Sequence, residues 1–118
     1  MFRPIVLSLL LVTPALAEDG PWRLDSLNGQ PVAAEVTLDL AQADRVAGQG
    51  PCNRYSGERV GLAPAFAVDA LGATKMACPE LTLEADYFAA LSAVTQVEES
   101  ESRLVLAGPG VELVFLRP

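Results

Sequence analysis

The residues with the widest range of possible chemistry in this chain are its two cysteines, Cys52 and Cys78. A thiolate can act as a nucleophile or a metal ligand, and a thiol pair can exchange electrons. A nucleophilic thiol is usually served by a histidine, and the chain contains none. A redox couple usually has C-x-x-C spacing, which these two cysteines lack. We therefore favour a structural disulfide, with a reactive thiol as the alternative.

The other chemical groups form no known catalytic or metal-binding pattern. Two cysteines without histidine cannot fill the four positions of a structural zinc site, and the acidic residues do not follow calcium-loop spacing. Ser56 has neither a G-x-S-x-G elbow nor a histidine base, and no spacing supports a Ser–Lys pair through Lys75. Carboxylates are so frequent that a pair of them says nothing about glycosidase chemistry. We predict no catalytic residue, no metal and no cofactor.

The first residues have the pattern of a secretory signal. Arg3 supplies a positive charge, residues 5–11 are apolar, and Ala15-Leu16-Ala17 is a small-x-small cleavage site. The alternative is a transmembrane anchor, but Pro14 interrupts a run that is already too short to span a bilayer. We expect cleavage after Ala17 and a periplasmic domain of residues 18–118, without stable insertion in the membrane.

Export would place both cysteines in an oxidising compartment, where they should pair. In the loop-entropy model a disulfide between Cys52 and Cys78 stabilises the fold by about 3–4 kcal/mol. A covalent cross-link of this kind is useful in a small domain, because a small domain buries a smaller share of its surface than a large one.

The chain is acidic, with a formal net charge of -7 at pH 7. Nucleic acids and anionic membranes select for basic patches, so the charge argues against both as partners. Solubility is the simplest explanation of the acidity, and an acidic binding face is the alternative.

Apolar and polar residues alternate repeatedly along the chain, which predicts short antiparallel strands. Asn28-Gly29 is a strong signal for a two-residue hairpin turn, and Gly108-Pro109-Gly110 breaks the chain before the last strand. The expected strands cover residues 22–26, 36–40, 45–49, 55–60, 65–71, 94–98, 103–107 and 111–116.

Residues 80–93 have a helical pattern instead, with good helix formers and neither glycine nor proline. The expected apolar stripe consists of Leu81, Ala85, Phe88 and Ser92, widened by Leu91. Glu80, Glu84 and Asp86 lie largely off this stripe. The predicted fold class is α+β, with a strongly curved, half-barrel-like antiparallel sheet of about 7–9 short strands around one helix.

We expect the largest apolar side chains to form the core, with Phe88 and Leu91 facing the concave side of the sheet. The predicted core residues are Trp22, Met76, Phe88, Leu91 and Phe115.

A polar cluster, Asn53, Arg54 and Tyr55, could form a recognition surface together with Lys75. In that interpretation Asn53 and Arg54 lie near the surface. The alternative, which we favour, is a local network in which Asn53 caps a turn and Tyr55 packs into the core.

Blocks of residues across nearly all of residues 18–118 form a further pattern. They are Trp22-x-Leu24-x-x-Leu27-Asn28-Gly29, Gly48-x-Gly50-x-Cys52-Asn53-x-Tyr55-x-Gly57, Thr74-Lys75-Met76-Ala77-Cys78-Pro79, the helical set Glu84, Phe88, Leu91 and Val94, and the strand pairs Leu104-x-Leu106 and Leu113-x-Phe115. Together these blocks resemble the META domain family, which includes the HslJ-like heat-shock proteins of bacteria. Lys75 stands where the family often has arginine, which keeps the charge but not the planar fork.

The resemblance implies a compact domain with a strongly curved antiparallel sheet around one helix. It also implies association with the bacterial envelope, with the stress response and with novobiocin-type drug tolerance. No catalytic residues are established for the family, so the resemblance supplies a fold rather than a mechanism.

We expect a non-catalytic, monomeric periplasmic protein that contributes to stress tolerance by binding a protein or a small apolar ligand. A secreted inhibitor of a protease or another enzyme is the alternative, and an unrecognised hydrolase is a third hypothesis. A rigid exposed loop at residues 53–57 would favour inhibition, whereas an apolar cavity between helix and sheet would favour ligand binding.

Overall fold

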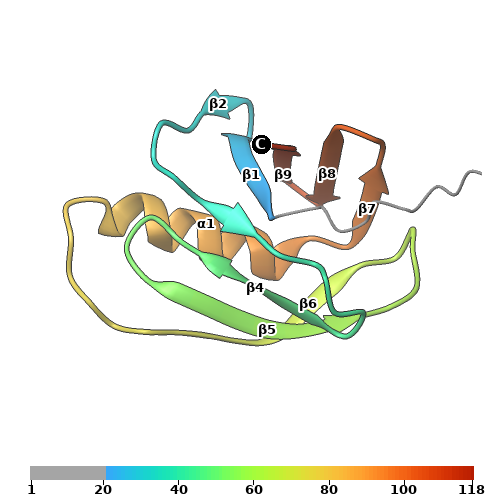
Figure 1. The fold of residues 1–118 in the computed structure, drawn as a ribbon, viewed down its shortest axis with the longest axis horizontal. Coiled ribbons are helices and arrows are strands. Elements are labelled where there is room, and N and C mark those ends of the chain that lie inside the picture. The colour runs from blue at the N-terminus through green and yellow to red at the C-terminus, as the bar shows by residue number, and fades with distance from the viewer. Residues whose placement is uncertain (1–20) are drawn as a thin grey trace, which may run out of the picture.

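A computed structural model describes residues 21–118, which contain nine strands and one helix (Figure 1). In chain order these are β1 (Trp22–Leu27), β2 (Gln30–Pro31), β3 (Thr37–Leu38), β4 (Arg45–Gln49), β5 (Arg54–Val60), β6 (Ala67–Ala73), α1 (Leu81–Ala93), β7 (Gln96–Glu99), β8 (Arg103–Gly108) and β9 (Val111–Leu116). In this part of the chain α1 is neither long nor apolar enough to cross a membrane. The predicted signal segment, residues 1–17, lies outside the described residues.

The strands form two antiparallel sheets that face each other across α1 (Figure 1). The larger sheet has the order β2-β1-β9-β8-β7, with β3 also paired to β1, and the smaller has the order β4-β5-β6. Single bridges link the sheets at two places, Asp39 to Ala47 and Ala65 to Gln96. The strands therefore curve around the helix without closing into a barrel, and the predicted α+β fold class is confirmed.

The tight turn predicted at Asn28-Gly29 is confirmed. Asn28 and Gly29 have φ values of 50° and 81°, and the flanking residues Leu27 and Gln30 pair across β1 and β2. Two consecutive positive φ angles give the turn the twist that a two-residue hairpin needs, and asparagine and glycine tolerate them best.

The strand predictions hold closely where pairing is local, and fail where the chain changes sheet. The β4 and β9 strands have the predicted bounds. The predicted strand at residues 36–40 is reduced to Thr37–Leu38, because the next residue, Asp39, already pairs with Ala47 in the smaller sheet. This segment divides its backbone hydrogen bonds between the two sheets.

The helix begins at Leu81, close to the predicted start, but it buries a different face from the one predicted. Its buried residues are Glu84, Tyr87, Ala90 and Leu91. Leu81 is 45% exposed, and Phe88 is only partly buried. The predicted stripe through Leu81, Ala85 and Phe88 was therefore wrong, and Glu84 was wrongly placed off the buried face.

Three of the five predicted core residues, Trp22, Leu91 and Phe115, are buried. Phe88 packs edge-on against Tyr55, with ring centroids 5.4 Å apart, but lies at the margin of the core. Met76 is 63% exposed, so its assignment to the core was wrong. The backbone of Met76 bonds inward to a polar side chain, and this leaves the thioether at the surface.

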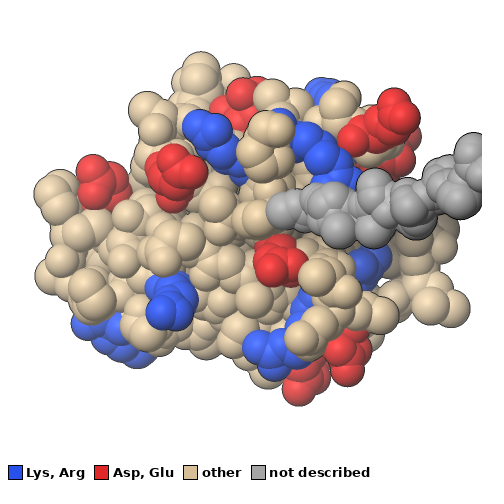
Figure 2. Space-filling view, viewed as in Figure 1, with Lys and Arg blue, Asp and Glu red and all other residues tan. Residues whose placement is uncertain are grey.

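Acidic and basic side chains are interspersed over the face shown in Figure 2, without a broad patch of one sign. Two ion pairs occur among the described residues, Arg23 with Glu35 and the partly buried Arg117 with Glu99, both at 3.9 Å. This face therefore carries no broad acidic surface.

Ala70 in β6 is strained and provides a test of the fold. Its φ is 54°, in the left-handed region, beside a register shift between β5 and β6. Ala70→Gly should stabilise the protein by about 1 kcal/mol, because a non-glycine residue there costs about 1–2 kcal/mol. The measurement is the urea midpoint of unfolding.

The control is Ala67→Gly in the same strand, where φ is not positive. It should destabilise the protein by about 0.5–1 kcal/mol, because glycine loses more backbone entropy on folding. Equal destabilisation by both substitutions would contradict the β6 geometry.

Candidate functional site

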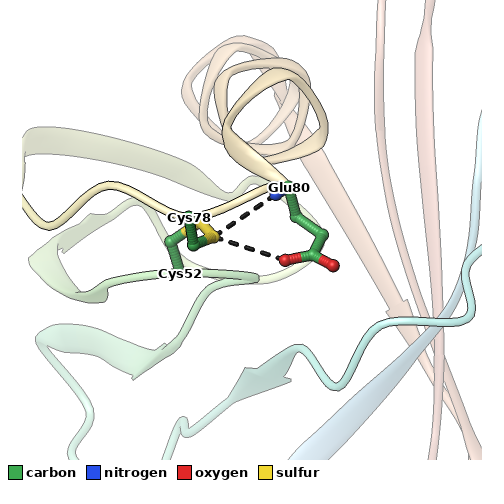
Figure 3. A group of neighbouring side chains, drawn as sticks. All are labelled: Cys52, Cys78 and Glu80. Atoms are coloured by element: carbon green, nitrogen blue, oxygen red, sulfur yellow. Dashed lines mark hydrogen bonds between the residues drawn. A yellow bond between two sulfur atoms is a disulfide. The ribbon is translucent and has the colours of Figure 1, made fainter.

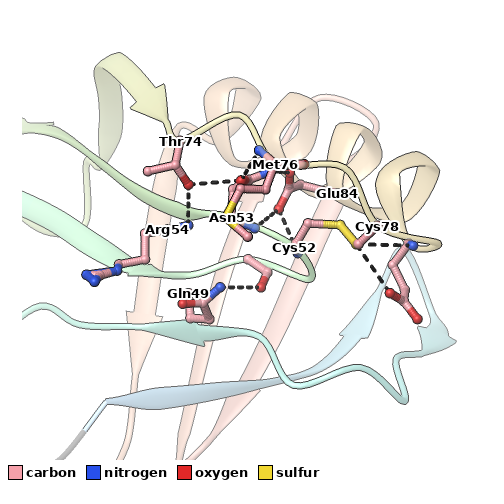
Figure 4. The surroundings of a disulfide bond; sticks show 10 residues. Gln49, Cys52, Asn53, Arg54, Thr74, Met76, Cys78 and Glu84 are labelled. Atoms are coloured by element: carbon pink, nitrogen blue, oxygen red, sulfur yellow. Dashed lines mark hydrogen bonds between the residues drawn. A yellow bond between two sulfur atoms is a disulfide. The ribbon is translucent and has the colours of Figure 1, made fainter.

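The centre of the candidate site is Glu84, a carboxylate on α1 with only 4% of its surface exposed. Its Oε2 accepts hydrogen bonds from the backbone N–H of Cys52 at 2.8 Å and of Asn53 at 2.6 Å. Its Oε1 accepts a bond from Asn53 Nδ2 at 2.7 Å (Figure 4). A buried charge is costly unless it is hydrogen-bonded, and three donors satisfy this one.

Asn53 extends the network to the segment that follows β6. Its Nδ2 also donates to the carbonyl of Met76 at 3.1 Å, and its Oδ1 accepts from the N–H of Met76 at 2.6 Å and from Thr74 Oγ1 at 2.9 Å. Asn53 is only 3% exposed. The prediction that it lies near the surface as a recognition residue was wrong, because its amide is consumed in joining three segments. The alternative is correct in giving Asn53 a structural role, but the network is not local, because the partners of its side chain are Thr74, Met76 and Glu84.

The other candidate recognition residues separate into two kinds. Tyr55 is buried, and its hydroxyl donates to the carbonyl of Thr37 at 2.6 Å while it lies 2.7 Å from the hydroxyl of Tyr87. Its predicted packing into the core is confirmed. Arg54 and Lys75 are exposed, so they remain available for contact with a partner.

The disulfide predicted between Cys52 and Cys78 is present, with Cα atoms 5.9 Å apart. It joins the turn before β5 to the segment before α1, so it ties together the elements that Asn53 and Glu84 connect. Glu80 lies beside it, and its N–H is 3.3 Å from Cys78 Sγ (Figure 3). The two sulfurs and the Glu80 carboxylate lie within 4.8 Å of one another. Disulfide sulfurs offer no thiolate, so this group is unsuited to a metal.

Burial alone would raise the pKa of Glu84, but the hydrogen bonds outweigh it. The bonds from the Asn53 side chain and from the N–H groups of Asn53 and Cys52 stabilise the charged form, and the net effect lowers the pKa below its usual value. A carboxylate that is ionised and fully bonded is a poor acid or base. Glu84 therefore anchors structure rather than moving a proton.

Two buried tyrosines lie beside this anchor. Burial raises the pKa of both Tyr55 and Tyr87 well above the usual value. Their rings meet edge-on, with centroids 5.6 Å apart, and Tyr87 is in turn 5.8 Å from Phe88. Both hydroxyls therefore stay protonated near neutral pH and serve as hydrogen-bonding groups.

Gly50 is needed for the close approach of the turn before β5 to the helix. A Cβ at this position would lie 2.8 Å from Glu84 Oε2 and 3.2 Å from Cζ of Phe88. Any larger residue would separate the backbone N–H groups from the carboxylate. The glycine in the block that led to the family resemblance therefore has a steric explanation here.

An open groove of about 420 Å³ lies directly over this anchored floor. It runs between α1 and residues 73–77, and Met76 and Leu81 are its exposed apolar walls, at 63% and 45% exposure. Phe88 contributes the margin of its ring. The full lining is Asn53, Ala73, Thr74, Lys75, Met76, Ala77, Leu81, Glu84, Ala85 and Phe88.

Sequence reasoning missed the role of Glu84. The available signal was its position three residues before Tyr87 and seven before Leu91, which places a carboxylate on the buried face of an otherwise apolar helix. Its hydrogen-bond donors are more than thirty residues away along the chain, so no local pattern reveals them. The groove was anticipated only as a cavity between helix and sheet.

Comparison with known proteins finds similarity to one domain family over nearly the full length of this chain. A family model described as META domain matches residues 14–118. An NMR structure of a protein from Burkholderia xenovorans is 26% identical, with a TM-score of 0.65, covering 98% of this chain and 99% of that chain. A second NMR structure is 25% identical, with a TM-score of 0.66, covering 90% of this chain and 95% of that chain. No curated protein matches the chain.

Glu84→Gln should destabilise the protein by about 2–3 kcal/mol, because the new amide would place a donor against a donor of Asn53. The free energy of unfolding in urea is the measurement. Glu80→Gln, at an exposed carboxylate, is the matched control and should change stability by less than about 0.5 kcal/mol. Equal losses of unfolding free energy in Glu84→Gln and Glu80→Gln would contradict the structural role assigned to Glu84.

The lowered pKa of Glu84 predicts how stability depends on pH. Its stabilisation is fully present above the ordinary pKa of an unfolded glutamate and is lost as the pH falls through the lower pKa of the folded state. The stability difference between the wild type and Glu84→Gln should therefore shrink as the pH is lowered from neutral to about 3. Urea midpoints across this range measure it, and a difference that grows on acidification would contradict the assignment.

Proposed function

The chain belongs to the META domain family, and from this premise we propose that it is a non-catalytic binding domain of the bacterial periplasm. The groove between α1 and residues 73–77 takes up an apolar ligand or an apolar segment of a protein. Through this binding the protein contributes to envelope stress or drug tolerance. The observation that carries the proposal is the pair of exposed apolar side chains, Met76 and Leu81, over a rigid polar floor.

The size and construction of the groove support ligand binding. Its volume of about 420 Å³ falls within the usual range of small-molecule sites. The floor is held in place by the bonds between Asn53 and Glu84 and by the disulfide of Cys52. A site that is rigid before binding loses less entropy when its ligand arrives.

The ionisation states of Glu84, in the groove floor, and of the buried pair Tyr55 and Tyr87 support binding rather than catalysis. Glu84 is held in its charged form by three hydrogen bonds, and Tyr55 and Tyr87 are held in their neutral forms by burial. General acid–base catalysis favours a pKa near the working pH, and these shifts move away from it. The disulfide is compatible with an oxidising compartment such as the periplasm.

The alternative of a secreted inhibitor receives less support from the geometry. An inhibitor would present residues 53–57 as a protruding rigid loop. Instead, Arg54–Val60 forms β5, the central strand of the smaller sheet, and Asn53 and Tyr55 are buried. Ligand binding in the groove is therefore the function that we retain.

An apolar fluorescent probe, anilinonaphthalene sulfonate, provides the test. It should bind the folded wild type saturably, and replacement of both Met76 and Leu81 by serine should weaken binding about fivefold or more. Both positions are exposed, so the urea midpoint should change little.

The matched control is Leu62→Ser. Leu62 is 88% exposed and equally apolar, but it lies in the turn between β5 and β6, away from the groove. Its substitution should leave probe binding unchanged. An equal loss of probe binding in Leu62→Ser and in the groove variant would contradict the proposal.

A further inference from the structure

The segment after β6 has one edge of its backbone occupied and the other open. Thr74 donates its N–H to the carbonyl of Arg54 at 3.1 Å, and Met76 bonds to the Asn53 side chain through both its N–H and its C=O. Backbone groups of successive residues in an extended chain point to opposite edges. The peptide groups of Lys75 and Ala77 therefore point away from β5.

That second edge is unpaired. Within residues 21–118, neither the N–H nor the C=O of Lys75 or Ala77 makes a hydrogen bond. The segment continues from β6, which is the last strand in the order of the smaller sheet. An open edge of this kind is a template on which another extended chain can pair.

The open edge and the groove coincide. Lys75, Met76 and Ala77 are groove residues, and the opposite wall is formed by Leu81, Ala85 and Phe88 of α1. A strand added along this edge could place alternate side chains against the apolar wall, with its backbone bonded to the peptide groups of Lys75 and Ala77. Backbone pairing supplies affinity in this mode of recognition, and the pockets supply specificity.

Charge narrows the choice of partner. Lys75 and Arg54 are exposed beside the edge, and within the described residues neither takes part in an ion pair. A second copy of this chain, paired antiparallel about Lys75, would bring like charges together, which is destabilising.

From these observations we infer that the edge at residues 73–77 binds an extended peptide segment of another protein, which adds as a strand to β6. The segment is apolar at alternate positions and carries an acidic residue facing Lys75. This inference rests on the proposed function, because it identifies the occupant of the same groove.

The probe is a random heptapeptide phage library selected on the full protein. Selected peptides should alternate apolar residues, carry an acidic residue and displace anilinonaphthalene sulfonate. N-methylation of the alternate residues that face the edge should weaken binding about tenfold or more, whereas N-methylation of the other set should not. Hydrogen exchange at the amides of Lys75 and Ala77 should slow when the peptide binds.

On the protein side, Ala77→Pro removes an edge N–H, and Ala77→Ser is the matched control that keeps it. Peptide binding should be lost in the first variant and retained in the second.

Dimerisation without peptide binding, failure to select any peptide, or equal effects of both N-methylated sets would overturn the inference. If the dye still binds in a groove-dependent way in those cases, the proposed function survives. If groove-dependent dye binding is absent as well, both fail.

Discussion

The arrangement of this domain depends on one buried carboxylate. Glu84 cannot be withdrawn from water as an anion unless donors meet it, and they come from the turn before β5. Through Asn53 the same contact reaches the segment that leads into the helix. One charge therefore fixes the position of α1 on the smaller sheet and the path of the chain that enters it. The Cys52–Cys78 disulfide secures the same junction covalently.

The surface groove follows from this polar anchoring. Because Met76 directs both of its backbone groups at Asn53, its side chain is left outside, where it faces the first turns of the helix. Leu81 is exposed for a related reason, since the buried face of α1 is occupied by Glu84, Tyr87 and Leu91. The apolar residues that line the groove are thus those that the polar network excludes from the core.

Local patterns in the sequence predicted most of the fold but little of the site. Alternation predicted β4 and β9 with their observed bounds, and Asn28-Gly29 predicted its hairpin, because both signals depend on near neighbours. The burial of Asn53 and Glu84 depends on partners distant in sequence, so residue type alone left Asn53 a candidate surface residue and placed Glu84 off the buried face. Met76 was wrongly predicted to be buried, because its apolar side chain does not reveal that its backbone bonds to Asn53 and leaves the side chain exposed.

The place of β9 has a consequence for how the chain is assembled. The last strand, β9, lies between β1 and β8. Asn28, next to the end of β1, and Glu112 of β9 are 84 positions apart in the sequence but exchange two hydrogen bonds. During synthesis β1 emerges first, yet its central partner emerges last, so the larger sheet cannot form until nearly the whole domain is available. Such long-range pairing slows folding. Loss of the final strand would split the sheet at its middle, whereas most chain ends can be trimmed with little harm.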